Sequence, residues 1–195
     1  TATPPPPSTI TQWLEYRIAA IRRAISEHVV SVTPSTGGPF AAAMVTGDRS
    51  HIPPEHVDAL RGSGLAHLLA ISGLHMALAG GAFFLGLRLV WPLTGSLALQ
   101  IPAVKVAAVG AIFGCTIYFL LSGGSIATQR AYIMALIAFG AKIIDKPALS
   151  LRSLAIAFAL IVLWHPEAVV TPGFQMSFAA SAALIGTFAS WSHQS

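Results

Sequence analysis

Charged side chains are scarce in this chain: Asp, Glu, Lys and Arg together make up 9% of its 195 residues. A typical soluble domain carries about 25% charged residues, so a globule of this length would lack the polar groups to cover its surface. Hydrophobic residues make up 54% of the chain, and the mean hydropathy is +0.71. The composition therefore argues against an ordinary soluble domain and predicts an integral membrane protein.

Cysteine is equally scarce, because Cys115 stands alone inside an apolar run. A single cysteine excludes an intrachain disulfide and carries no information on the redox compartment. The formal net charge is +4, but most cations flank apolar segments, where they indicate membrane topology rather than a nucleic-acid patch. The chain also lacks an initial methionine and a signal-peptide pattern. Residues 1–9 are typical of a proline-rich linker, so we expect a segment of a longer protein.

Residues 10–31 have the pattern of an amphipathic helix. Apolar residues recur at helical spacing from Leu14 to Val29, and Arg22 and Arg23 fall elsewhere around the helix. Such a helix suits the surface of a bilayer, although a helix packed on a soluble domain gives the same pattern. Residues 32–63 are rich in turn formers and predict an outer loop, with a short helix at Pro54–Arg61 because proline favours the first helical turn.

Residues 64–195 are expected to form a transmembrane bundle. Its candidate spans are each near the ~20 residues that a bilayer core requires, although the fourth is short enough to be a half-span. They are Leu65–Trp91, Val104–Leu121, Ile126–Ile144, Leu151–Trp164 and Phe174–Trp191. The sequence therefore predicts an all-α, polytopic membrane helix bundle of about five spans, preceded by an interfacial amphipathic helix.

The distribution of Lys and Arg predicts the orientation of these spans. The cations on the side where the first span begins are Arg49, Arg61 and Arg130. Those on the other side are Arg88, Lys105, Lys142, Lys146 and Arg152. Because cytoplasmic loops carry the excess of positive charge, the second side is expected in the cytoplasm and the N-terminal region outside it.

The first span combines small residues with polar ones. At about 100° per residue, the small residues form one stripe, which lets another helix approach closely. They are Ala66, Ala70, Gly73, Ala77 and Gly80, and Gly110 and Gly114 indicate close packing in the second span. His67, Ser72 and His75 fall on the opposite half of the helix. Lipid would not tolerate these groups unpaired, so we expect them to line a water-filled cavity or to bridge helices by hydrogen bonds.

Three sequence motifs resemble, in the same order, the competence region of the ComEC family, the bacterial DNA-uptake channel. They read TGDRSHIP…LRGSGLAHLLAISGLHMAL, SGGSIATQRAYIMAL and PGFQMSFAASAALIG, and the resemblance covers roughly Gly47–Gly186. It implies a channel for single-stranded DNA in the bacterial inner membrane, with the N-terminal region on the periplasmic side. The implied partners are the lipid bilayer, the remaining domains of the same protein and other components of the uptake machinery. The family's nuclease-like domain lies outside such a segment, so neither an enzymatic activity nor a cofactor is expected here.

The polar residues of these motifs fall on the predicted outer side, where they suggest a vestibule for the DNA strand. The candidates for a DNA path are His67, Ser72, His75, Arg130 and Gln175, and the outer loop motif adds Asp48 and Arg49. Arg130 is the strongest candidate for phosphate contact, because a guanidinium offers a planar fork of donors to an anion. Gly123, Gly124 and Gly173 would let backbone N–H groups approach an anion.

Each of these residues also has a structural interpretation. Arg130 could extend to the interface and set the topology, and Asp48–Arg49 could form a local turn or ion pair. Gln175 could simply join helices. Tyr132, Phe174 and Phe178 could stack on bases, although aromatic residues usually serve as core or interfacial anchors.

Other function classes have weaker support. The AISG segment is similar to the nucleophile motif of rhomboid intramembrane proteases, with Ser72 as nucleophile, but no base lies at a suitable position. His67 and His75 are eight residues apart, which does not match a metal-binding pair on a helix. A small-solute transporter would need the same lining residues, and only the family resemblance selects DNA as the cargo.

Overall fold

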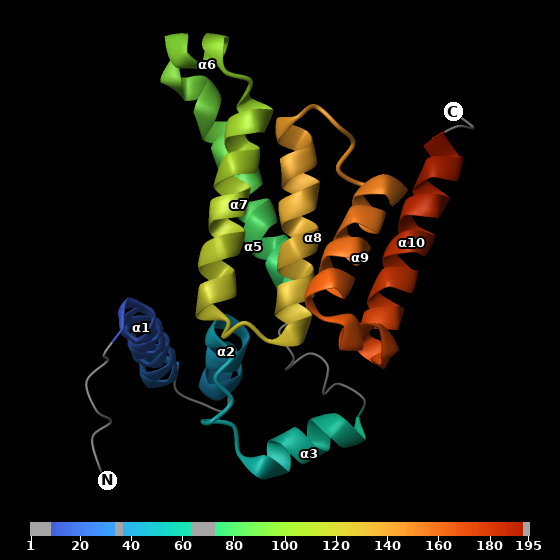
Figure 1. Ribbon diagram of the computed structural model, residues 1–195. Coiled ribbons are helices and arrows are strands. Elements are labelled where there is room, and N and C mark those ends of the chain that lie inside the picture. The colour runs from blue at the N-terminus through green and yellow to red at the C-terminus, as the bar shows by residue number, and fades with distance from the viewer. Residues whose placement is uncertain (1–8, 34–36, 64–72, 193–195) are drawn as a thin grey trace. The chain divides into compact units, whose positions relative to one another are not determined.

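A computed structural model describes residues 9–33, 37–63 and 73–192 of the chain. Every regular element in these ranges is a helix, which confirms the all-α prediction (Figure 1). The elements are α1 (Ile10–Val32), α2 (Gly37–Thr46), α3 (Pro54–Gly62), α5 (Gly73–Val90), η1 (Trp91–Thr94), α6 (Ser96–Gln100), α7 (Ala103–Leu121), α8 (Ile126–Ile143), α9 (Leu151–Trp164), η2 (Pro166–Val170) and α10 (Pro172–Ser192).

The chain divides into two compact units. The first comprises Thr1–Ile71 together with Leu120–Ser125, and the second comprises Ser72–Phe119 together with Ile126–Ser195. The turn between α7 and α8 therefore belongs to the first unit, although it joins two helices of the second.

In the first unit, α1 packs along α2. A small apolar cluster forms around Ala43 and Ile52, with Phe40, Val57 and Leu60 packed against it. Helix α2 lies within the segment that was expected to form a loop. The glycines and proline of Gly37–Pro39 indicate a turn, but Pro39 occupies the first turn of a helix that Phe40, the alanines and Met44 continue.

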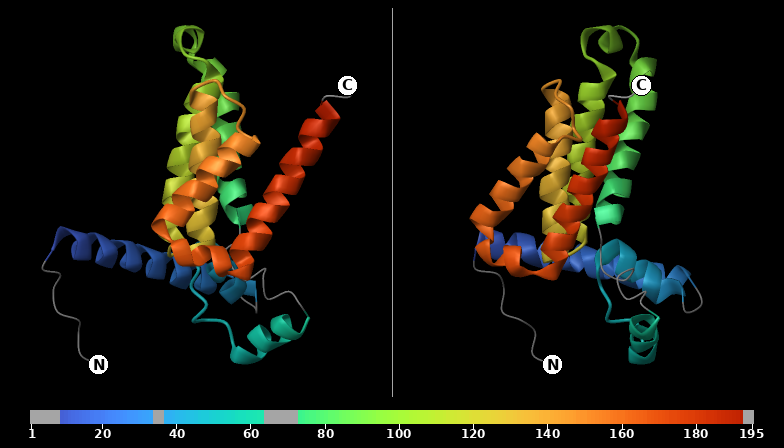
Figure 2. Two further views of the ribbon diagram at one scale, coloured as in Figure 1. Left: turned by 45° about the vertical axis from the view of Figure 1, so that its right-hand side comes forward. Right: turned by 90° about the vertical axis from the view of Figure 1, so that its right-hand side faces the viewer.

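In the second unit, α5 packs on α8, α8 on α9, and α9 on α10. Figure 1 shows these helices running alternately up and down, so that α5, α8 and α10 begin at the end where α7 and α9 finish. One buried cluster lies among α9, η2 and α10, with residues of α8 packed against it, and consists of Ala157, Ile161, Ala168, Phe174 and Phe178. Figure 2 shows α10 leaning away from the other helices toward its C-terminal end.

Two helical segments of the described ranges are long and apolar enough to cross a membrane. They are Gly73–Thr94 and Ala103–Leu121, and Leu151–Trp164 is apolar but shorter. The first expected span began at Leu65, and its residues before Gly73 lie outside the described ranges. The five-span arrangement therefore stays a prediction, while the observed helices fall where the apolar runs place them.

Candidate functional site

The outer loop motif begins at the C-terminal end of α2. Gly47 has a φ of 73°, a left-handed conformation that ends many helices and suits glycine. Its N–H donates to the carbonyl of Ala43 at 3.0 Å. The fully buried Thr46 donates its hydroxyl to the Ala42 carbonyl at 2.8 Å and accepts from the N–H of Asp48 at 3.3 Å. The helix end is therefore tied to the loop that follows it.

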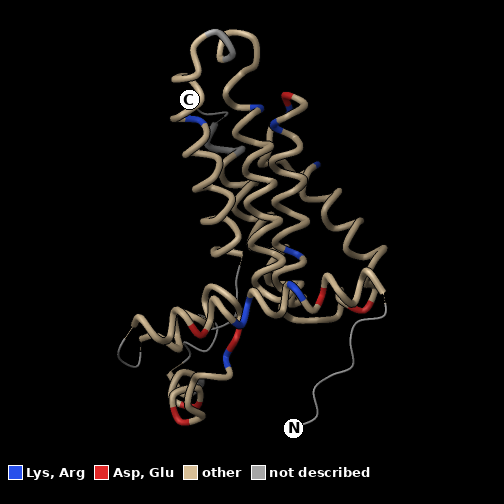
Figure 3. The backbone as a smooth tube through the Cα atoms, turned by 90° about the vertical axis from the view of Figure 1, so that its left-hand side faces the viewer, with Lys and Arg blue, Asp and Glu red and all other residues tan. Residues whose placement is uncertain are grey.

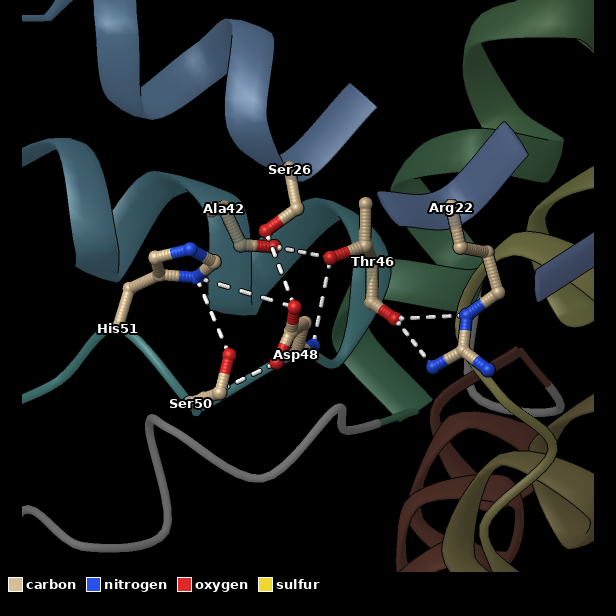
Figure 4. A network of polar contacts seen from close by, with 7 residues as sticks. All are labelled: Arg22, Ser26, Ala42, Thr46, Asp48, Ser50 and His51. Atoms are coloured by element: carbon tan, nitrogen blue, oxygen red, sulfur yellow. Dashed lines mark hydrogen bonds and ion pairs between the residues drawn. The ribbon is translucent and has the colours of Figure 1, made fainter. Parts of the chain in front are cut away.

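Two side chains of α1 form hydrogen bonds to the C-terminal end of α2 and to the loop that follows it (Figure 4). The Arg22 guanidinium donates from Nη2 and Nε to the Thr46 carbonyl, at 2.9 and 3.3 Å. Ser26, which is fully buried, donates to Asp48 Oδ2 at 3.3 Å. A cation at a helix C-terminus satisfies carbonyls that have no partner within the helix and interacts favourably with the helix dipole. We call Arg22, Ser26, Thr46, Asp48, Ser50 and His51 the Arg22 network.

Asp48 is held as a carboxylate in this network. Its Oδ1 accepts the Ser50 N–H at 3.0 Å, and His51 Nδ1 lies 3.8 Å from its Oδ2. The backbone N–H of Ser50, followed by the Ser50 hydroxyl, lowers the pKa of Asp48 below its usual value, and burial only partly opposes this effect. Arg49 is exposed. Of the two predicted loop residues, Asp48 organises the loop and Arg49 faces outward.

Gly123 belongs to the same unit and lies against the same guanidinium. Its φ is 79°, and a Cβ atom built on it would stand 2.5 Å from Arg22 Nη2. Arg22 therefore adjoins both the first motif, at Thr46, and the SGGS turn of the second. Sequence reasoning missed Arg22 and Ser26 as partners of these motifs. Their spacing of four residues shows that they share a helix face, but it does not identify a backbone carbonyl as the partner.

In the second unit, Arg130 connects the second and third motifs. It lies in the second turn of α8, and its Nη2 donates to the carbonyl of Gly173, at the start of α10, at 3.2 Å. Its Nε is buried and has no hydrogen-bond partner among the described residues. An Arg130 guanidinium with one donor engaged and another unsatisfied can bind an acceptor that the described chain does not provide.

Other candidates lie at the same end of this unit. Gln175, in the first turn of α10, is exposed and donates to the Val169 carbonyl at 3.1 Å. His75 is half-buried in the first turn of α5, and Gly73 of the same turn adjoins Ala131 of α8. The starts of α5, α8 and α10 therefore carry polar residues from all three motifs. His67 and Ser72 lie outside the described residues.

The predicted packing residues differ in their surroundings. A Cβ atom on Gly80 would stand 2.6 Å from Cys115 Sγ and 2.9 Å from Phe139 Cε2. Gly110 and Gly114 of α7 lie against Leu87 and Phe83 of α5, so a Cβ atom on either glycine would displace that side chain. Gly73 and Ala77 are exposed, and the nearest atom to a Cβ on Gly73 is the Ala131 Cβ at 3.9 Å. Close helix approach therefore involves Gly80, Gly110 and Gly114 within the described chain.

The aromatic residues considered for base stacking pack inside the helix bundle. Phe174 and Phe178 are 1% and 8% exposed, with ring centroids 4.5 Å apart. Tyr132 stacks on Phe119 at 4.7 Å, and its hydroxyl lies 2.9 Å from that of Thr116. These contacts assign the rings to helix packing. Within the described ranges, no group of three or more His, Cys, Asp or Glu residues could hold a metal ion.

Comparison with known proteins identifies one family. The family described as "Competence protein" matches residues 44–195. The chain is 27% identical over 172 residues to ComE operon protein 3 of Bacillus subtilis (strain 168), covering 88% of this chain and 21% of that protein. It is 34% identical over 155 residues to competence protein ComA of Neisseria gonorrhoeae, covering 77% and 21%. The chain thus spans about a fifth of the length of these relatives, and no solved structure matches it.

Proposed function

Because the chain belongs to the competence protein family, we propose that it forms part of a membrane channel that conducts single-stranded DNA across the bacterial inner membrane during natural transformation. The family and the relative from Neisseria gonorrhoeae are both named for competence, which is the capacity to take up DNA. In this proposal the segment guides the strand, and the catalytic steps of DNA processing belong elsewhere in the protein. Its partners are single-stranded DNA, the bilayer, the rest of the protein and the other uptake components.

The proposal places the apolar helices across the inner membrane in several passes. The segments Gly73–Thr94 and Ala103–Leu121 support it by length and composition. The excess of cations beside the C-terminal ends of α5 and α8 supports a cytoplasmic location for that end. The starts of α5, α8 and α10 then face the periplasm. The exposed apolar residues of α1, among them Ile10, Leu14 and Ile21, support its position along the bilayer surface.

One observation carries the assignment of a DNA path, namely the partly satisfied guanidinium of Arg130. The Gly173 carbonyl accepts a single hydrogen bond from Nη2 and holds the side chain at the end of the unit where α8 and α10 begin, which is the periplasmic end in this proposal. A phosphate oxygen would supply an acceptor to the remaining Nη donors of this guanidinium. Such a contact binds the DNA backbone independently of the base sequence, as an uptake channel requires.

The experiment that tests this role measures uptake of labelled DNA in cells that carry Arg130→Ala in the full-length protein. Loss of one charge-assisted contact of about 1.5–3 kcal/mol predicts a decrease in uptake of about tenfold or more. Arg130→Lys keeps a positive charge that binds phosphate as a point charge, so it should retain more uptake than the alanine variant. Arg23→Ala, which removes an exposed arginine of α1, serves as the matched control.

Membrane abundance of each variant is measured beside uptake. Reduced uptake at normal abundance, with partial rescue by lysine, supports the DNA path. Normal uptake in Arg130→Ala would exclude the role. A decrease in uptake that follows a decrease in abundance in both variants would assign Arg130 to helix packing.

A further inference from the structure

The end of the second unit where α5 and α8 finish, opposite to the end that carries Arg130, is strongly basic. Arg88 lies in the last turn of α5, Lys105 in the first turn of α7, Lys142 in the last turn of α8 and Arg152 in the first turn of α9, with Lys146 in the loop between α8 and α9. We call these five residues the basic end; Figure 3 shows blue segments gathered toward this end of the helices. The sequence from Gly73 to Trp164 contains one carboxylate, Asp145, so five cations face one anion. One carboxylate cannot neutralise five cations, so the basic end carries a large net positive charge.

The helix dipoles interact favourably with only some of these cations. Arg88 and Lys142 lie in the last turns of α5 and α8, where a cation interacts favourably with the helix C-terminus. Lys105 lies in the first turn of α7, where the dipole is unfavourable, but its Nζ is 2.7 Å from Asp145 Oδ2. Arg152 lies in the first turn of α9, with the same unfavourable dipole, and is exposed. No carboxylate in the neighbouring sequence compensates Arg152.

The loop that carries these cations is ordered by its own hydrogen bonds. Ser150 caps α9 by accepting the Ser153 N–H at 3.1 Å, and the Ser153 hydroxyl lies 3.5 Å from the Pro147 carbonyl. The Lys146 N–H donates to the Ala141 carbonyl at 2.8 Å. Lys146 and Arg152 are therefore attached to fixed backbone positions, and their placement reflects the fold rather than a disordered charged tail.

Large aliphatic side chains are exposed directly beside these cations. Ile144 is 66% exposed, Leu149 66% and Leu151 58%, and these residues flank Lys146 and Arg152 in sequence. Leu89 and Leu93, beside Arg88, are also exposed. Single-stranded nucleic acid sites combine cations with exposed aromatic rings, whereas a phospholipid offers a phosphate beside acyl chains. The alternation of cations with aliphatic residues fits the lipid.

We propose that the basic end binds the phosphate groups of anionic phospholipids, with Lys142, Lys146 and Arg152 as the main contacts. The exposed aliphatic residues beside them contact the adjoining acyl chains. This inference rests on the proposal that the helices span a membrane, but not on the nature of the cargo. It goes beyond orientation, because it predicts selective retention of anionic over zwitterionic lipid.

The test uses the full chain, solubilised from vesicles that contain equal amounts of phosphatidylglycerol and phosphatidylcholine. The measured quantity is the ratio of the two lipids that remain bound, determined by mass spectrometry. A basic residue at a membrane surface contributes about 1 kcal/mol, so each cation replaced by glutamine should lower this ratio about fivefold. The variants are Lys142→Gln, Lys146→Gln and Arg152→Gln, singly and together.

A charge-conserving variant provides the matched control. Lys142→Arg with Lys146→Arg and Arg152→Lys should retain the wild-type ratio, because the attraction to the head group depends on charge. If the triple glutamine variant does not accumulate, Arg152→Gln alone can be used, because this site is exposed. It should lower the ratio of bound phosphatidylglycerol to phosphatidylcholine about fivefold. Equal retention of both lipids by the wild-type chain would overturn the proposal.

A second measurement separates lipid from nucleic acid. Glutamine variants that keep the lipid ratio but lose binding of a single-stranded oligonucleotide would assign the basic end to the DNA path and overturn the lipid inference. A chain that does not enter vesicles at all would contradict the membrane proposal itself. Normal uptake in Arg130→Ala would exclude the DNA role of that residue and leave the lipid ratio unchanged.

Discussion

Different interactions stabilise each of the two units internally. In the first unit, a guanidinium, a hydroxyl and a carboxylate bridge α1 to the end of α2 through the Arg22 network. In the second, glycines bring helices close together at Gly80 and Gly114, and aromatic rings fill the core around Phe174. The first arrangement depends on charge and hydrogen-bond geometry, and the second depends on volume. Changes of volume and of charge should therefore affect the units separately.

The largest effect is expected from a change of volume in the second unit. In Gly80→Leu, the added Cβ would stand 2.6 Å from the buried Cys115 Sγ, so the side chains or helices around it must shift. Such overpacking should destabilise the protein by about 3 kcal/mol or more. Thermal unfolding of the purified protein, followed by tryptophan fluorescence, measures the change.

Gly86→Leu is the matched control for this volume test. It lies on the same helix, and a Cβ atom there meets nothing within 4 Å. Leucine should be neutral or stabilising at this site, by up to about 1 kcal/mol, because it favours the helix more than glycine does. Equal effects of the two substitutions would show that the close approach at Gly80 does not contribute to stability.

A smaller effect is expected when the polar contacts of the first unit are broken. Arg22→Ala removes both donors to the Thr46 carbonyl and should cost about 1.5–3 kcal/mol of local stability. Hydrogen exchange of the α2 amides should become faster, while that of α8 and α9 stays the same. Arg22→Lys should rescue only in part, because an ammonium lacks the planar fork of donors.

The neighbouring arginine tests whether charge alone explains this effect. Arg23 is exposed on the same helix, and Arg23→Ala removes the same charge. It should leave the exchange of α2 unchanged. If Arg22→Ala accelerated exchange equally in α2 and α9, the two units would unfold as one, and the comparison between them would fail.

The smallest effect is a pH dependence confined to the first unit. The pKa of Asp48 is lower in the folded chain than its ordinary value of 3.8. Its stabilising contribution is therefore complete above about pH 4 and is lost as the pH falls through the folded-state pKa. Because the carboxylate is partly exposed, the loss should stay below about 1 kcal/mol.

Hydrogen exchange of α2 between pH 6 and pH 3, corrected for the intrinsic rates, measures this contribution. Asp48→Asn should abolish the added opening at low pH, because asparagine does not titrate. A variant with an unchanged pH profile would show that another group controls the first unit in acid.

The sequence predicted a helix accurately where an apolar run is bounded on both sides by glycine, proline or polar residues. The apolar runs placed α7, α8 and α9 within a residue or so of their observed bounds, because glycine, proline and polar residues interrupt them. The prediction was wrong at α2, where glycine and proline form the first turn of a helix rather than a loop. The same residue types serve both purposes, so the sequence around Pro39 is ambiguous by itself.

The candidate site was predicted as a set of residues but not as a set of contacts. Motif positions identified Arg130, Gln175 and Asp48 as residues of interest. The partners of these side chains are mostly backbone groups: Gly173 O for Arg130, Val169 O for Gln175, and the Ser50 N–H for Asp48. Every residue has a backbone carbonyl, and nearly every residue has an N–H, so no side-chain pattern marks the one that is used.

Composition and local pattern were enough to predict an apolar, all-helical chain with cations at the ends of its helices and three family motifs in order. These properties follow from composition and from periods of a few residues, which are local. Three features became visible only in the packed helices: Arg22 bonds to the end of α2, Gly80 adjoins Cys115 while Ala77 stays exposed, and Phe174 and Phe178 are buried. Those outcomes depend on which helices adjoin one another, because a contact across many residues is selected by the packing of the whole unit.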